Sequence, residues 1–177
     1  MFQQELENGI RIRVLEQSDI DAYHNLIMEA KDELKEWLTV SEKVATKEQT
    51  AENIAYQMKV NDPVPTLFMI EFENQLVGQI SFHTVDDTNQ SGEIGYWLLK
   101  AYQGHGIMTK ALNFLITYGF MTLKFHRLEM KIAKGNTKSH LLAKRLGFRQ
   151  EGVLKEAKYL NGQFIDYIVY GLLEQDK

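Results

Sequence analysis

The sequence predicts an α+β domain built on a mixed, twisted sheet of about seven strands with helices on both faces. Several short runs alternate apolar and polar residues, as half-buried strands do, and four longer runs repeat apolar residues at helical spacing. Along the chain these runs follow the order β-α-α-β-β-β-α-β-α-β-β. Because the 177 residues contain no low-complexity tract or internal repeat, we expect one domain spanning 1–177.

The first third of the chain contains one predicted strand and two predicted helices. Residues 10–14 alternate isoleucine and valine with arginine, which predicts a short half-buried strand. We expect a helix to follow, ending near Ala30. Thr46 and Gln49 have the spacing of a capping box, so a second helix should begin there and end before Pro63.

From Thr66 onward the apolar period changes to two. Residues 67–73 and 76–84 flank a polar turn and predict an antiparallel hairpin, and residues 92–99 form the next strand. Residues 107–122 return to helical spacing, and 127–133 predict a strand. Asn136 should cap a last helix that Gly147 ends, and Asn161-Gly162 should turn a C-terminal hairpin.

Composition excludes several classes of function. With 20 Lys+Arg against 24 Asp+Glu, the net charge of -4 gives no basis for general binding of nucleic acid or anionic lipid. The chain has no cysteine, and its five histidines lack ligand spacing, so we expect no metal site. No apolar run approaches the ~20 residues of a membrane span, and no signal peptide is evident. We therefore expect a cytoplasmic protein that does not bind membranes.

The segment GEIGYWLLKAYQGHGIMTKAL places a strand, a glycine-containing turn and a helix in direct succession. The start of a helix has unpaired N–H groups, and glycines let a phosphate approach the backbone closely, so the segment suits anion binding. A P-loop requires G-x-x-x-x-G-K-[ST], and the segment lacks that spacing. A dinucleotide-binding fingerprint requires G-x-G-x-x-G, and its third glycine is missing after Gly104 and Gly106.

This turn resembles the pyrophosphate loop of the GNAT superfamily of acetyl-CoA-dependent N-acetyltransferases, Arg/Gln-x-x-Gly-x-Gly/Ala after the fourth strand. Gln103, Gly106 and Met108 occupy its three defined positions. Met108 departs from the usual small residue. Since the loop binds through backbone N–H groups, we expect this to change local packing more than binding.

Two further features extend the resemblance over nearly the whole chain. The element order is that of the superfamily, and its second cofactor-contacting segment, N-x-x-S-(x)7-G-F, matches at Asn136, Ser139, Gly147 and Phe148. The start IRIRVLEQSD, the EIGYW strand and the Y-L-N-G turn are most similar to the bacterial ribosomal-protein N-terminal acetyltransferases, the RimJ/RimL type.

The resemblance implies acetyl-CoA as co-substrate and no metal. The pantetheine arm would bind the strand backbone around Trp97–Leu99, and the pyrophosphate would bind the turn. The residues expected to bind the cofactor are Trp97, Leu98, Leu99, Gln103, Gly104, His105, Gly106, Ile107, Met108, Thr109 and Asn136.

The same resemblance suggests a catalytic role for Ser139, and the strand pattern suggests one for Glu93. Many members place a tyrosine acid seven residues after the capping Asn, where this chain has Ala143, and in ribosomal-type members a serine at the position of Ser139 is the proposed acid. Glu93 begins the central strand and could deprotonate the amine, directly or through a water, or hold its ammonium form. Ribosomal-type members tend to have a glutamate where this chain has Lys158, so Glu93, Glu156 or a water remains open as the base.

Direct attack within a ternary complex is the expected route, because the chain has neither a cysteine nor a G-x-S-x-G elbow. The favoured acceptor is the α-amino group of a protein, notably a ribosomal protein, and the alternative is a polyamine or other small amine. A non-catalytic acyl-CoA-binding regulator and a nucleotide-binding switch are the rival classes. Ribosomal-type relatives commonly pair, and Trp37-Leu38 and the terminal strands offer apolar contact, so we expect a homodimer.

Overall fold

The computed structural model describes residues 2–38 and 44–176. The chain divides into two compact units. Unit 1 comprises Met1–Ser81 and Tyr96–Ala111, and unit 2 comprises Phe82–Gly95 and Leu112–Lys177. The single domain expected over 1–177 remains a prediction.

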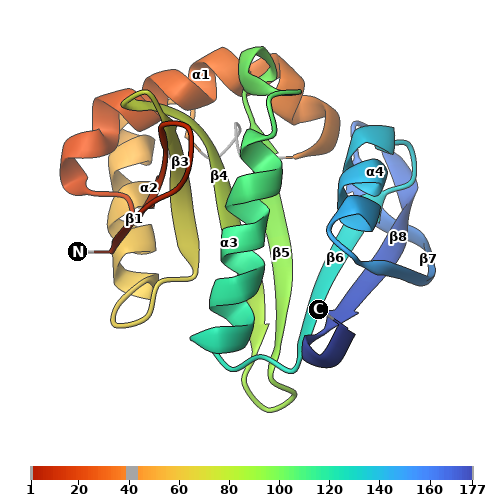
Figure 1. Ribbon diagram of the computed structural model, residues 1–177. Coiled ribbons are helices and arrows are strands. Elements are labelled where there is room, and N and C mark those ends of the chain that lie inside the picture. Colours follow the sequence, from red (N-terminus) through yellow and green to blue (C-terminus); the bar gives the residue numbers. More distant parts are fainter. Residues whose placement is uncertain (1, 39–43, 177) are drawn as a thin grey trace. The chain divides into compact units, whose positions relative to one another are not determined.

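The described residues form a mixed sheet of 8 strands, in the order β1-β2-β3-β4-β5-β6-β8-β7, together with four α-helices (Figure 1). Neighbouring strands are antiparallel in the pairs β1·β2, β2·β3, β3·β4, β6·β8 and β7·β8, and β5 is parallel to β6. The elements are β1 Gln3–Glu5, β2 Ile10–Arg13, α1 Ile20–Trp37, α2 Lys47–Val60, β3 Leu67–Phe72, β4 Gln75–Asp86, β5 Ser91–Leu98, α3 Ile107–Met121, β6 Arg127–Ala133, α4 Thr137–Arg145, β7 Arg149–Leu160 and β8 Gln163–Leu173.

The structure confirms the predicted fold class and differs from the expected elements in two places. Strand β1 is additional; its three residues are exposed and polar, so they show no alternation that a sequence pattern would reveal. Helix α1 continues beyond Ala30 to Trp37, because Leu34 lies one turn after Ala30 on the same face and is also buried.

The predicted boundary signals are otherwise confirmed. The Thr46 side chain accepts a hydrogen bond from the Gln49 N–H, and the capping box of α2 is complete. Asn161 and Gly162 have positive φ angles of 51° and 82°, as a two-residue turn between β7 and β8 requires.

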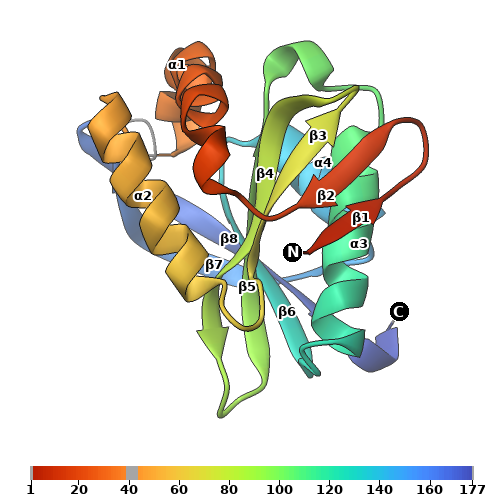
Figure 2. The same cartoon turned by 90° about the vertical axis from the view of Figure 1, so that its left-hand side faces the viewer.

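In unit 1, helices α1 and α2 cover one face of strands β3 and β4 (Figure 2). Tyr23, Ile27 and Ile54 from these helices are buried together with Met69 of β3 and Trp97 of β5. The residues next to Met69 in sequence point to the opposite face, because side chains alternate along a strand. On that face, Ile10 of β2, Phe72 of β3 and Ile107 of α3 line a common hollow.

In unit 2, helices α3 and α4 contribute to a second buried core. Phe82 and Phe125 meet edge to face with ring centroids 5.2 Å apart, and Gly119 of α3 lies against the Phe82 ring. Helix α4 packs on β6 and β8, where Ala143 is fully buried (Figure 1). Ala143 therefore helps to pack α4 in unit 2.

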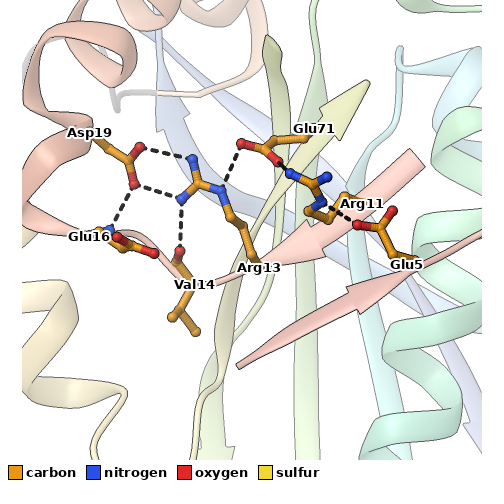
Figure 3. Close-up of polar contacts among 7 residues, drawn as sticks. All are labelled: Glu5, Arg11, Arg13, Val14, Glu16, Asp19 and Glu71. Carbon is orange, nitrogen blue, oxygen red and sulfur yellow. Dashed lines mark hydrogen bonds and ion pairs between the residues drawn. The ribbon is translucent and has the colours of Figure 1, made fainter. Parts of the chain in front are cut away.

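A network of ion pairs occupies the boundary of the unit 1 core (Figure 3). Arg13 donates to both oxygens of Asp19, at 2.7 and 2.8 Å, and to Glu71 at 2.8 Å. Glu71 also accepts from Arg11 at 3.0 Å, and Arg11 in turn pairs with Glu5. Burial raises the pKa of Asp19, but the hydrogen bonds from Arg13 and from the Glu16 N–H outweigh it and lower the pKa overall.

We expect Arg13→Met to lower the free energy of unfolding by about 3 kcal/mol, because it leaves two buried carboxylates without their common cation. Chemical denaturation at neutral pH measures this change. Lys35→Met is the control, since the pair of Lys35 with Asp32 is exposed, and it should change stability by less than about 0.5 kcal/mol. Equal effects of the two variants would contradict the prediction.

Candidate active site

The predicted anion site is the turn between β5 and α3. Gly104 and Gly106 have φ angles of +84° and +78°, and an added Cβ at either would meet nothing within 4 Å, so the turn is open on its outer side. The Gln103 side chain donates to the Leu98 carbonyl at 3.0 Å and ties the turn to the end of β5. Helix α3 begins at Ile107 without an acidic residue in its first turn, so its N–H groups and positive dipole end can bind an anion.

An apolar hollow of about 320 Å³ lies beside this turn in unit 1. The turn residues His105 and Ile107 contribute to its wall, and Phe72 and Tyr102 meet there with ring centroids 6.0 Å apart. A pyrophosphate requires donors rather than apolar walls, so the hollow is not its site. The remaining lining residues are Asn8, Ile10 and Ala101.

The strand residues Trp97, Leu98 and Leu99 are buried, and the Trp97 and Leu99 side chains belong to the unit 1 core. The Leu99 N–H donates to the Val77 carbonyl at 2.9 Å. Only backbone groups of this segment can therefore serve a ligand. Met108 and Thr109, in the first turn of α3, are half-buried.

The second predicted segment is the start of α4 in unit 2. The Asn136 side chain accepts from the Ser139 N–H at 3.2 Å, so Asn136 caps the helix as predicted. Ser139 is half-buried, and within residues 2–38 and 44–176 its hydroxyl has no hydrogen-bond partner. That hydroxyl is available to a bound molecule.

His140 holds the first turn of α4 against the sheet of unit 2. Its Nδ1 lies 3.0 Å from the Tyr170 hydroxyl, and its Nε2 lies 3.1 Å from the carbonyl oxygens of Ala133 and Lys134. The carbonyls require Nε2–H as donor, so the neutral ring accepts at Nδ1 from Tyr170. His140 is therefore committed to orienting α4.

Glu93 lies at the start of β5 in unit 2, with its side chain 15% exposed and both oxygens paired. Its Oε1 is 3.2 Å from His83 Nε2, and its Oε2 accepts from Lys131 Nζ at 2.7 Å. Burial raises the pKa of Glu93, but the hydrogen bonds from His83 and Lys131 outweigh it, so its pKa lies below its usual value. Such a carboxylate is a weak base, and both of its oxygens already have partners.

The alternative base, Glu156, is exposed at an irregularity of β7. Its φ angle is +49°, and its N–H donates to Asp166 at 3.0 Å. Lys158, two residues later, pairs in register with Ile165 of β8. Glu156 therefore lies in a β-bulge, which the hydrogen bond from its N–H to the Asp166 carboxylate stabilises.

The predicted residues fall into both units. The turn from Gln103 to Thr109 belongs to unit 1, whereas Glu93, Asn136 and Ser139 belong to unit 2. The sequence analysis missed His83 and Lys131 as partners of Glu93. Only the parallel register, which places Glu93 opposite Glu129, reveals that Lys131 is near, and no short motif encodes that register.

Within residues 2–38 and 44–176, no group of three or more His, Asp or Glu side chains is arranged to hold a metal ion. No helix there has the length and apolar character needed to cross a membrane.

Comparisons with known proteins identify the family of this chain. The family described as Acetyltransferase (GNAT) domain matches residues 10–149. The chain belongs to this family. A GNAT acetyltransferase uses acetyl-CoA as co-substrate, and the open, glycine-rich start of α3 fits the pyrophosphate of that molecule.

The similar GNAT proteins include enzymes with named acceptors. YdaF of Bacillus subtilis (strain 168) is 33% identical over 99% of this chain and 97% of its own. The ribosomal-protein-serine acetyltransferase of Escherichia coli (strain K12) is 30% identical over 93% of both chains. The solved structure of RimL, a ribosomal L7/L12 alpha-N-protein acetyltransferase in complex with coenzyme A, has a TM-score of 0.91 at 27% identity over 98% of both chains. The spermidine N(1)-acetyltransferase of Escherichia coli (strain K12) is 27% identical over 62% of this chain and 59% of its own.

We expect Gly106→Val to raise the Kd of acetyl-CoA more than about ten-fold, because a branched side chain at φ +78° strains the turn and occupies the space the phosphates need. Gly162→Val is a matched control, since Gly162 has a φ of +82° and equally open surroundings in the β7–β8 turn. Isothermal titration of both variants tests this expectation. A folded Gly106→Val protein with wild-type affinity would contradict it.

Proposed function

We propose that the protein transfers the acetyl group of acetyl-CoA to the N-terminal α-amino group of a protein, with a ribosomal protein as the favoured acceptor. The observation that carries the proposal is the Ser139 hydroxyl, half-buried and without a partner in the described residues, on a helix start that Asn136 caps. Similarity over nearly the full chain to the ribosomal-protein-serine acetyltransferase supports the choice of acceptor.

Backbone groups would bind the cofactor. The N–H groups from Gly104 to Thr109 would hold the pyrophosphate, with Gln103 keeping the turn in place through the Leu98 carbonyl. The backbone of Trp97–Leu99 would pair with the pantetheine arm. Asn136 would contribute through the orientation of α4.

The chemical step begins with a neutral acceptor amine. Its nitrogen lone pair attacks the thioester carbonyl carbon, forming the C–N bond, and the C–S bond then breaks with its electrons moving to sulfur. The Ser139 hydroxyl gives its proton to the departing thiolate and regains one from water, while the amide nitrogen releases one proton to water. One proton is gained and one released, so the reaction yields an acetylamide and the free thiol of CoA.

Glu93 would act on the acceptor as an anion rather than as a direct base. Both of its oxygens are engaged by His83 and Lys131, and its pKa is lowered by these hydrogen bonds against the effect of burial. Water would then receive the proton of the amine. Glu93 would orient the water and the amine on the acceptor side.

Acetyl-CoA-dependent acetylation of a serine-initial peptide tests the proposed function. We compare this peptide with the same peptide blocked at its N-terminus, with a whole ribosomal-protein mixture and with spermidine, and locate the acetyl group by tandem mass spectrometry. Acetylation of the free α-amino group supports the proposal. Preference for spermidine would favour the small-amine alternative, and CoA binding without turnover would favour a non-catalytic regulator.

Ser139→Ala should lower kcat about 100-fold and leave the acetyl-CoA Kd nearly unchanged, because the hydroxyl acts only as the thiolate departs. Thr137→Ala, in the same helical turn with an exposed side chain, is the control and should retain kcat. We measure kcat, Kd and melting temperature on one preparation of each variant. An unchanged kcat with reduced stability of Ser139→Ala would leave solvent as the proton donor.

We also propose a cytoplasmic homodimer. Acetyl-CoA and ribosomal proteins share the cytoplasm. The hairpin of β7 and β8 exposes Val153, Leu154, Tyr159 and Phe164, by 44, 42, 60 and 62%, and Leu38 is 36% exposed at the end of α1. Tyr159 and Phe164 stack edge to face, with ring centroids 5.0 Å apart, which forms a preorganised apolar contact.

Sedimentation at micromolar concentration should show a species of twice the 20.5 kDa chain mass. Replacing Tyr159 and Phe164 together with serine should shift it toward the monomer, because this removes the largest exposed apolar contact of the hairpin. Replacing the exposed Tyr56 of α2 with serine is the control. A wild-type protein that sediments only as a monomer would reject the dimer.

A further inference from the structure

The Lys131 side chain binds Glu93 in the way that the alkylammonium group of a substrate would bind it. The Lys131 Nζ donates to Glu93 at 2.7 Å, and the Glu93 side chain is only 15% exposed. His83 occupies the other carboxylate oxygen at 3.2 Å. The hydrogen bond to Glu93 raises the pKa of Lys131, so Lys131 is a cation at neutral pH. An acceptor ammonium that approached Glu93 would have to compete with this lysine.

Charge compensation of this kind recurs on the neighbouring strands of unit 2. Arg127 donates to Glu151 at 2.8 Å and to Glu129 at 3.3 Å. Lys134 and Lys155 lie 3.5 and 3.2 Å from the Asp166 carboxylate. A polyamine carries several ammonium groups and needs several unmatched carboxylates. These strands instead match each of these carboxylates with a cation.

We infer that Lys131 sets acceptor specificity: its ammonium group neutralises Glu93, so that the site disfavours polycationic amines and accepts an amine of which a substantial fraction is neutral in solution. The inference rests on the proposed function and names the residue that selects the acceptor class. Lys131 is a specificity-determining residue here and makes no bond to the reacting carbonyl. Its neighbours that bear on this charge are Glu93, Glu129 and, through Glu93, His83 and Tyr167.

The ionisation of amines makes such a selection effective. At about pH 7.5, an α-amino group of pKa roughly 7.8 is about one-third neutral, whereas an alkylamine of pKa about 10.4 is only about 0.1% neutral. Because Glu93 is already paired with Lys131 and His83, it cannot also concentrate and deprotonate the second kind of amine. It still serves the first kind, which already supplies a nucleophilic lone pair.

Steady-state kinetics of the full chain with spermidine and with a serine-initial peptide test the inference. Lys131→Met should raise the ratio of kcat/KM for spermidine to that for the peptide about ten-fold, mainly through a lower KM for spermidine, because Glu93 becomes free to bind a cation. Added salt should reduce this gain, since the new attraction is between charges. Lys131→Arg keeps the charge and should keep the wild-type ratio.

Lys155→Met is the matched control, because it removes one lysine from a different carboxylate, Asp166, in the same unit. It should leave the ratio unchanged. Lys131→Gln and a melting curve accompany Lys131→Met, so that a folding defect in one variant does not decide the result. A ratio that stays at the wild-type value in folded Lys131→Met and Lys131→Gln, or a wild-type preference for spermidine, overturns the inference. A wild-type protein that acetylates neither acceptor overturns the proposed function instead.

Discussion

The passage from strand β5 to helix α3 is the constraint on which the cofactor site depends. The chain must turn within a few residues and still leave the first N–H groups of α3 unobstructed. Two glycines at positive φ, Gly104 and Gly106, make the turn possible without side chains above it, and the Gln103 side chain fastens it to Leu98. The buried Ile107 then fixes the start of the helix. If the phosphates bind through backbone groups, as we propose, Met108 can replace the usual small residue without loss of the motif.

In unit 2, by contrast, polar side chains are held by hydrogen bonds and ion pairs within the protein before a substrate binds. His140 is bound to Tyr170 and to two carbonyl oxygens, which holds the first turn of α4, where Ser139 lies. Glu93 is likewise held by its cationic and imidazole partners. Groups fixed in this way need little reorganisation during the reaction, which is the main advantage of a preorganised polar site.

The sequence predicts most of this architecture because local signals dominate it. The capping role of Asn136 follows from its own side chain, and the β7–β8 hairpin follows from its turn residues. Strand β1 was missed because three exposed polar residues have no pattern. The partners of Glu93 were missed for another reason: Lys131 is remote in sequence and reaches it only through the parallel pairing of β5 with β6. Pairwise charge contacts across a sheet depend on register, which single-sequence patterns do not specify.

Amide resonances of isotopically labelled protein, followed as coenzyme A is added, test most directly whether the β5–α3 turn holds the cofactor through its backbone. We expect the largest shifts at the N–H groups of Gly104, Gly106 and Ile107, because hydrogen bonds to phosphate oxygens form there. Pantetheine, which lacks the pyrophosphate, should leave these three resonances almost unmoved. Coenzyme A binding that shifts other residues while these amides stay in place would contradict the assignment of the site.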